Sequence, residues 1–327
     1  MTSLDRYHRQ MLLPGIGREG QLALQSSHAL LVGCGALGSA IADTLIRAGL
    51  GTLTLVDRDL VECTNLQRQT LYCESDVNTP KAFAAQSRLS TINSSARIVA
   101  LTEDFNPSNA QQILDNKFVP QHEPAPPPVS LILDGLDNFP TRYLLNDLAV
   151  SRALPYIYGG AVATTGLSFT VLPKKSPDAD STRQRSLYSA DQSTPCLRCV
   201  FPEAPPPGIS PTCDTAGVLG PIVSIIAAHQ AAQAIKLLTN NAAQLDRSLL
   251  SFDLWSNDLH RFDLSPTANS DCPCCGKHDF EYLNSSAHAD AASLCGRDAV
   301  QIMPPSSNSD FAQSRLDLNQ FAARLAP

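Results

Sequence analysis

The sequence predicts an α/β fold in which a doubly wound, mostly parallel sheet is extended by additional strands. Through the first half of the chain, short apolar runs typical of strands alternate with helical patterns. The first run, HALLVG at 28–33, leads into the spacing Gly33-x-Gly35-x-x-Gly38, and a helical pattern follows over 36–48. With 327 residues, 43% of them hydrophobic and 17% charged, the chain can bury one large α/β core or two small ones.

Later elements continue this alternation. Further strands are expected at the apolar runs TLTLVD, ARIVAL and SLILDG, over 52–57, 96–101 and 130–135. A helix is expected to open with Thr79 as its capping residue and Pro80 in its first position. Others are expected after Asn106-Pro107 and over 140–152. The runs TGLSFTVL, SLLSFDLW and HRFDL, between 165 and 264, predict the strands that extend the sheet.

The domain organisation is expected to be simple. Residues 1–283 are predicted to form one domain, and 284–327 a tail in which a short helix near 311–325 is the one amphipathic stretch. Three segments rich in proline or polar residues are expected to be loops, at 119–129, 173–195 and 202–211. The apolar window 218–238 is interrupted by polar side chains, which favours a buried helix over a membrane span.

Charge and composition exclude several classes of function. The formal net charge is −7 and no block of Lys and Arg is present, so nucleic acid is not expected as a partner. The first fifteen residues carry charges and lack the apolar core of a secretory signal, so we expect a cytoplasmic protein without a membrane contact. Ten cysteines in such a protein indicate metal or thiol chemistry rather than disulfides.

The glycine motif predicts a nucleotide site. Gly33, Gly35 and Gly38 lie between a strand and a helix, where the backbone can approach a phosphate and the helix N-terminus offers unpaired N–H groups. Asp57 ends the next predicted strand, where its carboxylate can accept hydrogen bonds from a ribose diol. The alternative is that the glycines only make a tight turn.

The residues after Asp57 favour ATP over NAD. Asn65, Arg68 and Gln69 follow within twelve residues, and Lys81 begins the next helix, which places two cations near the phosphates. A triphosphate under attack needs such neutralisation, whereas the pyrophosphate of NAD is bound mostly by backbone donors. Either cation alone is equally consistent with a solvated surface charge.

Two aspartates lie at the carboxyl end of the fourth predicted strand, at the sheet edge where open α/β proteins bind ligands. Asp137 or Asp134 can hold Mg²⁺ there. Alternatively, Asp134 closes the turn and Asp137 caps the helix that follows.

The cysteines form two CxxC pairs. Cys196 and Cys199 make one pair and Cys272 and Cys275 the other, which predicts a tetrahedral zinc site with no open coordination position, hence a structural one. Cys274 is a spare thiol, and a redox role for either pair is the less favoured alternative.

Cys213 precedes a helix and is a candidate nucleophile or an inert small residue. The seven histidines show no pattern of a metal pair or a catalytic triad.

At this point the sequence resembles the ThiF/MoeB/HesA family of sulfur-carrier adenylyltransferases, relatives of ubiquitin-activating enzymes. The resemblance covers about residues 5–283 and is carried, in order, by RYHRQMLLPGIGREGQ, GCGALGS, LVDRDLVECTNLQRQTLY, the pair Pro80-Lys81, DGLDNFPTR, CLRC, CDTAGVLGP and CPCCG. The segments CDTAG and SFDLWSND are more similar to thiazole-branch ThiF proteins than to molybdopterin-branch MoeB.

The resemblance implies a Rossmann-like, usually homodimeric enzyme that adenylylates the C-terminal Gly-Gly carboxylate of a small ubiquitin-like sulfur carrier and releases pyrophosphate. It implies that Asp57 reads the ribose, that Asp137 binds Mg²⁺, and that four cysteines hold zinc. Phosphate contacts fall on Asn65, Arg68 and Lys81, with Gln69 nearby. Arg9 is implied to reach into the neighbouring subunit's site, and Cys213 matches a position proposed in some members to capture the activated carrier.

Departures from the family pattern bear on the partners. The inserted loops at 119–129 and 173–195 are unusual, and no rhodanese domain follows residue 283, so a separate protein is expected to donate sulfur. An NAD-dependent oxidoreductase and a non-catalytic scaffold are the alternative functions. The oxidoreductase would not require Arg68, Lys81 or a zinc site, and the scaffold would not require the full set of ATP-site residues.

Overall fold

The computed structural model describes residues 4–120, 122–174, 187–203 and 216–285, together with the backbone of two strands at 291–294 and 299–302. The chain divides into two compact units, residues 1–286 and residues 287–327. The second contains an antiparallel pair, β9 (Ala291–Leu294) and β10 (Ala299–Ile302), which the sequence analysis did not predict. The expected helix near 311–325 lies outside the described residues.

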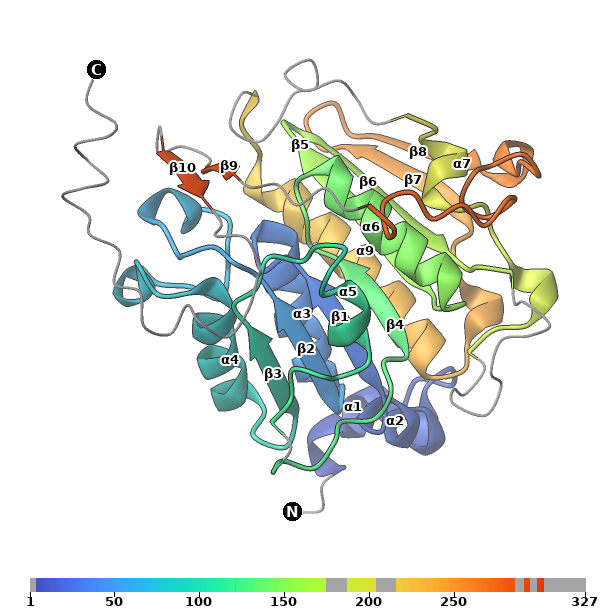
Figure 1. Cartoon of the computed structure of the whole chain (residues 1–327). Helices are drawn as coiled ribbons and strands as arrows, with labels where there is room; N and C mark the ends of the chain where they lie inside the picture. Colours follow the sequence, from blue (N-terminus) through green and yellow to red (C-terminus); the bar gives the residue numbers. More distant parts are fainter. Residues whose placement is uncertain are drawn as a thin grey trace, which may run out of the picture. The chain divides into compact units, whose positions relative to one another are not determined.

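The first unit is built on one eight-stranded sheet in the order β3-β2-β1-β4-β5-β6-β7-β8 (Figure 1). The strands from β3 to β5 pair in parallel, and β6, β7 and β8 extend the sheet in antiparallel order. This confirms the predicted mostly parallel sheet with added strands. The bounds of the strands are β1 (His28–Val32), β2 (Thr52–Val56), β3 (Arg97–Leu101), β4 (Leu131–Asp134), β5 (Tyr156–Val162), β6 (Thr165–Val171), β7 (Ser248–Asp253) and β8 (Asp258–Asp263).

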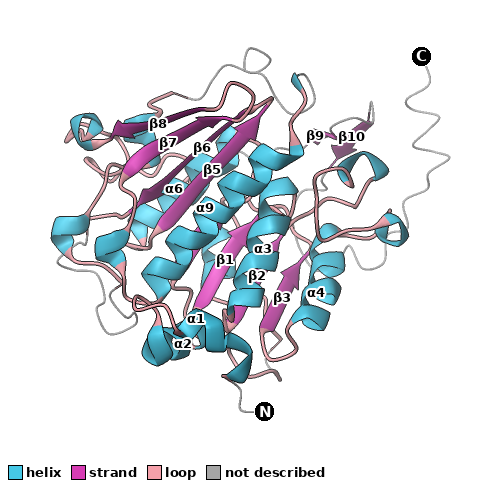
Figure 2. Ribbon diagram, turned by 180° about the vertical axis from the view of Figure 1, so that it is seen from behind, coloured by secondary structure: helices cyan, strands magenta, loops and turns pink. Residues whose placement is uncertain are grey.

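Helices cover both faces of the sheet (Figures 1 and 2). On one face lie α3 (Ala36–Ala48), α4 (Lys81–Ile92) and α9 (Gly220–Leu238); on the other lie α5 (Ala110–Leu114) and α6 (Phe139–Ser151). The shorter helices are α1 (His8–Met11), α2 (Gly17–Gln25) and α7 (Leu197–Val200), with 3-10 turns η1 (Asp5–Tyr7), η2 (Cys63–Asn65), η3 (Glu74–Asp76), η4 (Ala190–Gln192), η5 (Ala242–Gln244) and η6 (Ser265–Thr267).

The core has two halves because successive side chains of a strand point to opposite faces. In β1, Leu31 packs with α3 and α9, whereas Leu30 and Val32 pack with α5 and α6. Every residue of β1 is buried, as is typical of a central strand covered by helices on both sides.

Helix α9 confirms the prediction of a buried helix. It is long and apolar enough to cross a membrane by length and composition alone. It packs against α3, β5 and β6, and its Ile226 and Ala227 are fully buried. Its polar Gln230 is also buried and donates hydrogen bonds to the carbonyls of Asp134 and Ile157, so this polar side chain serves the packing of the helix on the sheet.

The start of α4 differs from the prediction. Pro80 is the N-cap rather than the first helical residue, and no side chain, including that of Thr79, caps the helix. Residues 79–81 instead pair with 59–61: Val61 N donates to Thr79 O and Lys81 N to Asp59 O, at 2.9 and 2.8 Å. This pairing holds Pro80 in an extended conformation and delays the helix until Lys81.

Strand β5 was absent from the sequence prediction. Its segment YIYGGAV contains Gly159 and Gly160, and paired glycines weaken a strand pattern. A Cβ on Gly159 would lie 2.2 Å from Oε1 of Gln230, so the buried amide of Gln230 on α9 occupies the space that a side chain would take there.

The predicted loops are described only in part. Residues 119–120 and 122–129 contain no regular secondary structure, as predicted. Residues 175–186 and 204–215, which hold most of the other two predicted loops, lie outside the described residues, and η4 lies at the end of the segment 173–195.

Candidate nucleotide site and cysteine cluster

The glycine motif forms a tight turn between β1 and α3. Gly33 has a φ of +90°, and a Cβ there would lie 2.5 Å from the carbonyl oxygen of Gly135. A Cβ on Gly38 would lie 1.9 Å from the carbonyl oxygen of Gly33. The turn after β1, the first turn of α3 and the turn after β4 are therefore in backbone contact, which brings three parts of the site to one edge of the sheet.

Gly35 is the glycine of the motif with free space around it. It is the N-cap of α3, and no side chain caps this helix. The nearest atom to a Cβ built there is Nε2 of Gln69, at 3.9 Å. Gln69 is buried, and its Oε1 has no hydrogen-bond partner. An uncapped helix N-terminus with a buried amide beside it is a suitable site for a phosphate.

Asp57 follows β2 at the same edge. Its Oδ2 accepts a hydrogen bond from Cys34 N at 2.6 Å and its Oδ1 from Asp59 N at 2.8 Å, so the carboxylate is fixed against the glycine turn. Burial raises the pKa of Asp57 to about 6, against the opposing effect of Lys81. Each carboxylate oxygen keeps a further lone pair, so Asp57 can still accept the two hydroxyl hydrogens of a ribose.

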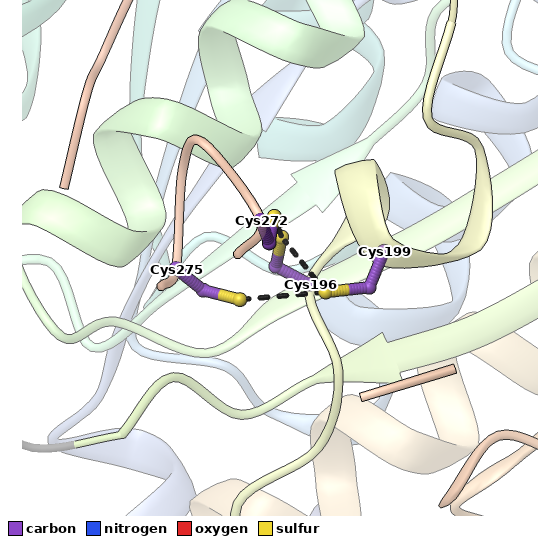
Figure 3. Close-up of side chains that lie close together, drawn as sticks. All are labelled: Cys196, Cys199, Cys272 and Cys275. Carbon is purple, nitrogen blue, oxygen red and sulfur yellow. Dashed lines mark hydrogen bonds between the residues drawn. The ribbon is translucent and has the colours of Figure 1, made fainter. Parts of the chain in front are cut away.

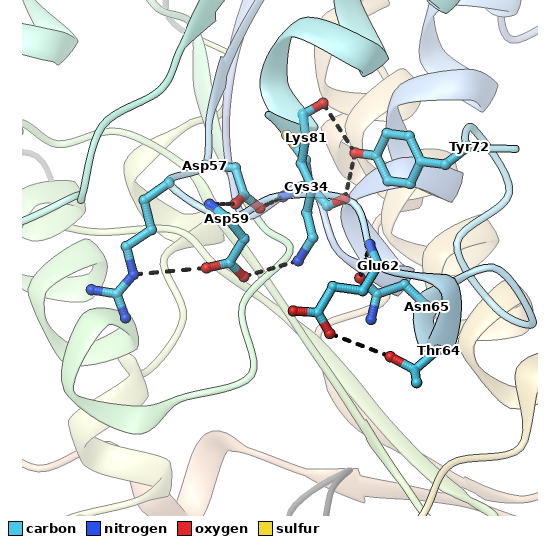
Figure 4. A network of polar contacts seen from close by, with 9 residues as sticks. Cys34, Asp57, Asp59, Glu62, Thr64, Asn65, Tyr72 and Lys81 are labelled. Carbon is cyan, nitrogen blue, oxygen red and sulfur yellow. Dashed lines mark hydrogen bonds and ion pairs between the residues drawn. The ribbon is translucent and has the colours of Figure 1, made fainter. Parts of the chain in front are cut away.

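Lys81 and Asp59 form an ion pair beside Asp57 (Figure 4). Nζ of Lys81 lies 2.9 Å from Oδ2 of Asp59, and the lysine is 7% exposed. Burial lowers the pKa of Lys81, but Asp57, Asp59 and Asp137 outweigh it, so the net shift is upward and the ammonium stays charged. A surface charge does not have this burial or these partners, so the structure favours the interpretation of Lys81 as a site residue.

Asn65 and Arg68 belong to the short turn η2 and its continuation. The side chain of Asn65 accepts a hydrogen bond from Glu62 N and so helps to close this turn (Figure 4). Arg68 is partly exposed and donates to the carbonyl of Thr64 at 3.0 Å. Its Cβ lies close to Gly220, the first residue of α9. Arg68 thus lies at the edge of the site rather than inside it.

The two aspartates after β4 have different roles. Asp134 is fully buried: its Oδ2 accepts from Tyr156 Oη at 2.5 Å and pairs with Nε of Arg142 at 3.3 Å. This supports a structural role for Asp134 in closing the turn. Asp137 does not cap α6, because Asn138 is the N-cap and accepts from Thr141 N. Asp137 is exposed, and its charge acts on Lys81 and on Arg142.

The structure does not bring Arg9 to the nucleotide site of its own chain. Arg9 is exposed on α1. Its neighbour Gln10 donates to the carbonyl of Ala48, the last residue of α3, whereas the nucleotide site is at the first. A helix of this length separates the two by about 20 Å, so Arg9 lies at the opposite end of the sheet from its own site. Cys213 lies outside the described residues.

The four predicted zinc ligands form one cluster (Figure 3). The sulfur atoms of Cys196, Cys199, Cys272 and Cys275 all lie within 4.8 Å of one another. Neighbouring sulfurs are 3.4, 3.7 and 3.9 Å apart, and about 3.8 Å is the edge of a tetrahedron with zinc–sulfur bonds of about 2.3 Å. The donor set and its spacing therefore fit a tetrahedral metal ion. Cys274 is outside the cluster, as preferred from the sequence.

Sequence reasoning missed three residues that build the site. Asp59 holds Lys81, Arg142 holds the turn before Asp137, and the hydroxyl of Tyr72 donates to the carbonyl of Cys34 in the glycine turn at 2.8 Å. Asp59 is two residues from Asp57, and Arg142 follows Asp137 by five. Their positions within the motifs VDRDLVE and DGLDNFPTR were the available signals, and neither indicates which partner the side chain contacts.

Comparison with known proteins shows similarity in both sequence and fold. A family model described as the ThiF family matches residues 7–274. The Bacillus subtilis protein named sulfur carrier protein ThiS adenylyltransferase is 40% identical over 299 residues, which cover 91% of this chain and 79% of the relative. A Thermus thermophilus sulfur carrier protein adenylyltransferase is 37% identical, covering 84% and 91%. The crystal structure of Escherichia coli MccB with ATP shares the fold, with a TM-score of 0.63, 21% identity and coverage of 83% and 74%.

The two glycines give a matched pair of substitutions. We expect Gly38→Ala to lower the free energy of unfolding by about 3 kcal/mol, because its methyl group meets the carbonyl of Gly33 and overpacking typically costs about 1–3 kcal/mol. Gly35→Ala meets no atom closer than 3.9 Å and should keep wild-type stability while binding ATP more weakly. Urea unfolding and ATP titration of both variants test this, and equal stability of the two would contradict the packing argument.

Asp57 predicts a pH dependence of nucleoside binding. Adenosine keeps its charge between about pH 5 and 8, so a change in its affinity reports on the protein. Below a pH of about 6 Asp57 becomes protonated and loses acceptors, so adenosine affinity should fall with falling pH. Asp57→Asn should bind about tenfold more weakly and lose this dependence, because a hydrogen bond to a charged group contributes about 1.5 kcal/mol. Calorimetric titration checks this, with Asp43→Asn as control, because Asp43 is partly exposed and paired with Arg47. A pH profile of Asp57→Asn equal to that of the wild type contradicts the assignment.

Proposed function

We propose a function for this protein from the premise that the chain belongs to the ThiF family: it transfers AMP from ATP to the C-terminal carboxylate of a sulfur carrier protein and releases pyrophosphate. The observation that carries the proposal is the 40% identity, over 91% of the chain, to a protein named as the adenylyltransferase of the carrier ThiS. The site supports it, because a lysine and an uncapped helix N-terminus converge where a phosphate chain can lie.

The chemistry requires positive charge more than a proton acceptor. The attacking group is a carboxylate, which is already ionised at neutral pH and needs no general base. Attack on the α-phosphate brings two anions together, and that repulsion must be offset as the bond to pyrophosphate breaks. Lys81 is a buried cation on which the charge of Asp57 acts, and the partly exposed Arg68 is a second cation. We therefore assign binding and orientation of the phosphates to Lys81, Arg68, Asn65 and Gln69, and binding of the ribose to Asp57.

Two metals fit the residues present. The exposed carboxylate of Asp137, close enough to act on Lys81, suits Mg²⁺, which binds through one or two carboxylates together with substrate phosphates. The four cysteine sulfurs suit Zn²⁺, and because all four positions are filled by protein the zinc is a structural one. When bound, Mg²⁺ neutralises phosphate charge and Zn²⁺ stabilises the folded chain.

The partners follow from the family. The carrier is proposed to be a small ubiquitin-like protein that ends in Gly-Gly, of the thiamine branch, with the molybdopterin-branch carrier as the alternative. A separate protein is proposed to donate sulfur, and Cys213 remains a candidate thiol for a carrier adduct.

The protein is proposed to be a cytoplasmic homodimer in which Arg9 enters the neighbouring subunit's site. Its exposure on α1, at the far end of the sheet from its own site, is compatible with such a role.

Pyrophosphate exchange tests the reaction. With Mg²⁺ and a Gly-Gly-ended carrier, labelled pyrophosphate should enter ATP, and carriers of the thiamine and molybdopterin branches in separate assays identify the branch. Asp137→Ala should lower the exchange rate roughly 100-fold, the effect of removing one group that stabilises transition-state charge. Asp115→Ala, which removes an exposed carboxylate paired with Arg152, is the control. Exchange that needs no carrier, or that survives in Asp137→Ala, contradicts the proposal.

Subunit mixing tests the role of Arg9. Arg9→Ala and Lys81→Ala should each be inactive alone, but a mixed dimer holds one site with Lys81 from one chain and Arg9 from the other. Random mixing of equal amounts should restore about a quarter of wild-type exchange, since half of the dimers are mixed and each has one complete site. Activity of Arg9→Ala by itself, or no recovery on mixing, contradicts an arginine supplied across the interface.

A further inference from the structure

The two cysteine pairs are held by one buried side chain on α6. Asn146 is fully buried, and its Oδ1 accepts a hydrogen bond from Leu197 N, next to Cys196, at 2.8 Å. Its Nδ2 donates to the sulfur of Cys274, between the ligands of the second pair, at 3.2 Å. The side chain thus bridges two segments that are more than seventy residues apart in the sequence.

Only a side-chain amide can make both bonds. The backbone N–H of Leu197 is a donor and requires the amide oxygen, which leaves the NH₂ group for the sulfur. The S–H group of Cys274 is hydrogen-bonded to the carboxylate of Asp147, so the sulfur acts as an acceptor towards residue 146. A carboxylate at position 146 would therefore keep the first bond and lose the second, and an apolar side chain would lose both. The spare thiol of Cys274 is explained by this contact: it is the point at which the second cysteine turn is attached to α6.

Neighbouring residues of α6 strengthen the attachment without joining the two pairs directly. Oδ2 of the buried Asp147 accepts from Tyr282 N at 2.9 Å, and the hydroxyl of Tyr143 donates to the carbonyl of Phe201 at 2.8 Å. The rings of Tyr143 and Tyr282 stack with centroids 4.9 Å apart. Residues 143, 146 and 147 lie on one face of the helix, at the spacing of three and four residues. Both cysteine segments therefore dock on this face.

We propose that Asn146 is a positioning residue of the metal site, which holds the two CxxC pairs at coordinating distance before the metal binds and thereby sets the metal affinity. The inference rests on the zinc site proposed above. If the metal itself must bring the two loops together, the cost of ordering the loops reduces the free energy of metal binding. If the ligands are already oriented, this cost does not reduce the metal affinity. Substitution of residues that orient metal ligands typically weakens metal affinity about 10- to 100-fold.

The experiment compares zinc affinity in four variants of the full chain, purified with zinc and titrated with a chromophoric chelator. Asn146→Leu removes both hydrogen bonds at similar volume, and Asn146→Asp removes only the donor to sulfur. Cys199→Ser removes a ligand. Asn93→Leu is the matched control, because Asn93 is also buried and donates to Tyr7 Oη and to the Ile46 carbonyl, far from the cysteines in the fold.

We expect zinc affinity to fall about 10- to 100-fold in Asn146→Leu, to fall in Asn146→Asp as well, and to stay at the wild-type value in Asn93→Leu even where its melting temperature is lower. Replacement of zinc by Co²⁺ gives a second readout, since the thiolate–cobalt absorption bands should shift in the Asn146 variants and not in the control. Wild-type affinity and spectrum in the Asn146 variants overturn the inference, and so does equal weakening in Asn93→Leu. If Asn146→Leu does not fold, the zinc affinity of Asn146→Asp tests the inference.

The outcome separates this inference from the proposed function. A wild-type chain that binds no zinc overturns the metal site and with it the role of Asn146, while pyrophosphate exchange judges adenylylation independently. Stoichiometric zinc in the wild type with unchanged affinity in both Asn146 variants overturns the role of Asn146 alone.

Discussion

The site depends on a backbone contact between the turns that follow β1 and β4. Gly33 and Gly135 approach so closely that neither tolerates a side chain facing the other, and Gly38 in the first turn of α3 closes the same contact. The parallel register of Val32 with Val56 and Asp134 brings the ends of three strands level. Consequently the N-terminus of α3, the carboxylate of Asp57 and the turn bearing Asp137 share one edge of the sheet, as ligand sites of open α/β sheets do.

A buried ion pair fixes the second of these turns. Asp134 accepts from Leu136 N, and Arg142 donates to the Leu136 carbonyl, so both backbone polar groups of Leu136 are held. A buried pair contributes little net stability compared with apolar packing, although loss of one partner costs about 3–5 kcal/mol. The benefit of the pair is conformational: it holds the turn immediately before Asp137 in one arrangement. Helix α6 then continues from that turn to Asn146, so the same helix links the nucleotide edge to the cysteine cluster.

The sequence predicted best those features that are set by local pattern. The strand and helix around the glycine motif, the strands that extend the sheet and the four clustered cysteines are all confirmed. It failed where a long-range contact overrides the pattern. Strand β5 was missed because it contains two adjacent glycines, one of which faces the buried Gln230 of α9, and α4 starts late because Pro80 pairs with Leu60.

Side-chain partners were the least predictable part of the site. Lys81 was identified as a cation near the phosphates, but its pairing with Asp59 depends on the bridge between residues 59–61 and 79–81. Asp134 and Asp137 occupy equivalent positions in the sequence pattern, and only burial separates them: one is fully enclosed by Tyr156 and Arg142, and the other faces solvent. Asn146 lies in an unremarkable helical segment, and its role follows from two segments that the fold brings to it.

The charge balance of the site limits what can bind there. Asp57, Asp59 and Asp137 all act on Lys81, so three carboxylates face its single ammonium group. A phosphate chain that enters this field is repelled unless further positive charge comes with it or from outside. A divalent cation at Asp137 and an arginine from a neighbouring subunit are the two sources that the proposed function supplies. Under the proposed function, the acidic character of the site does not argue against a polyanionic substrate, because the metal and the neighbouring subunit would supply the compensating positive charge.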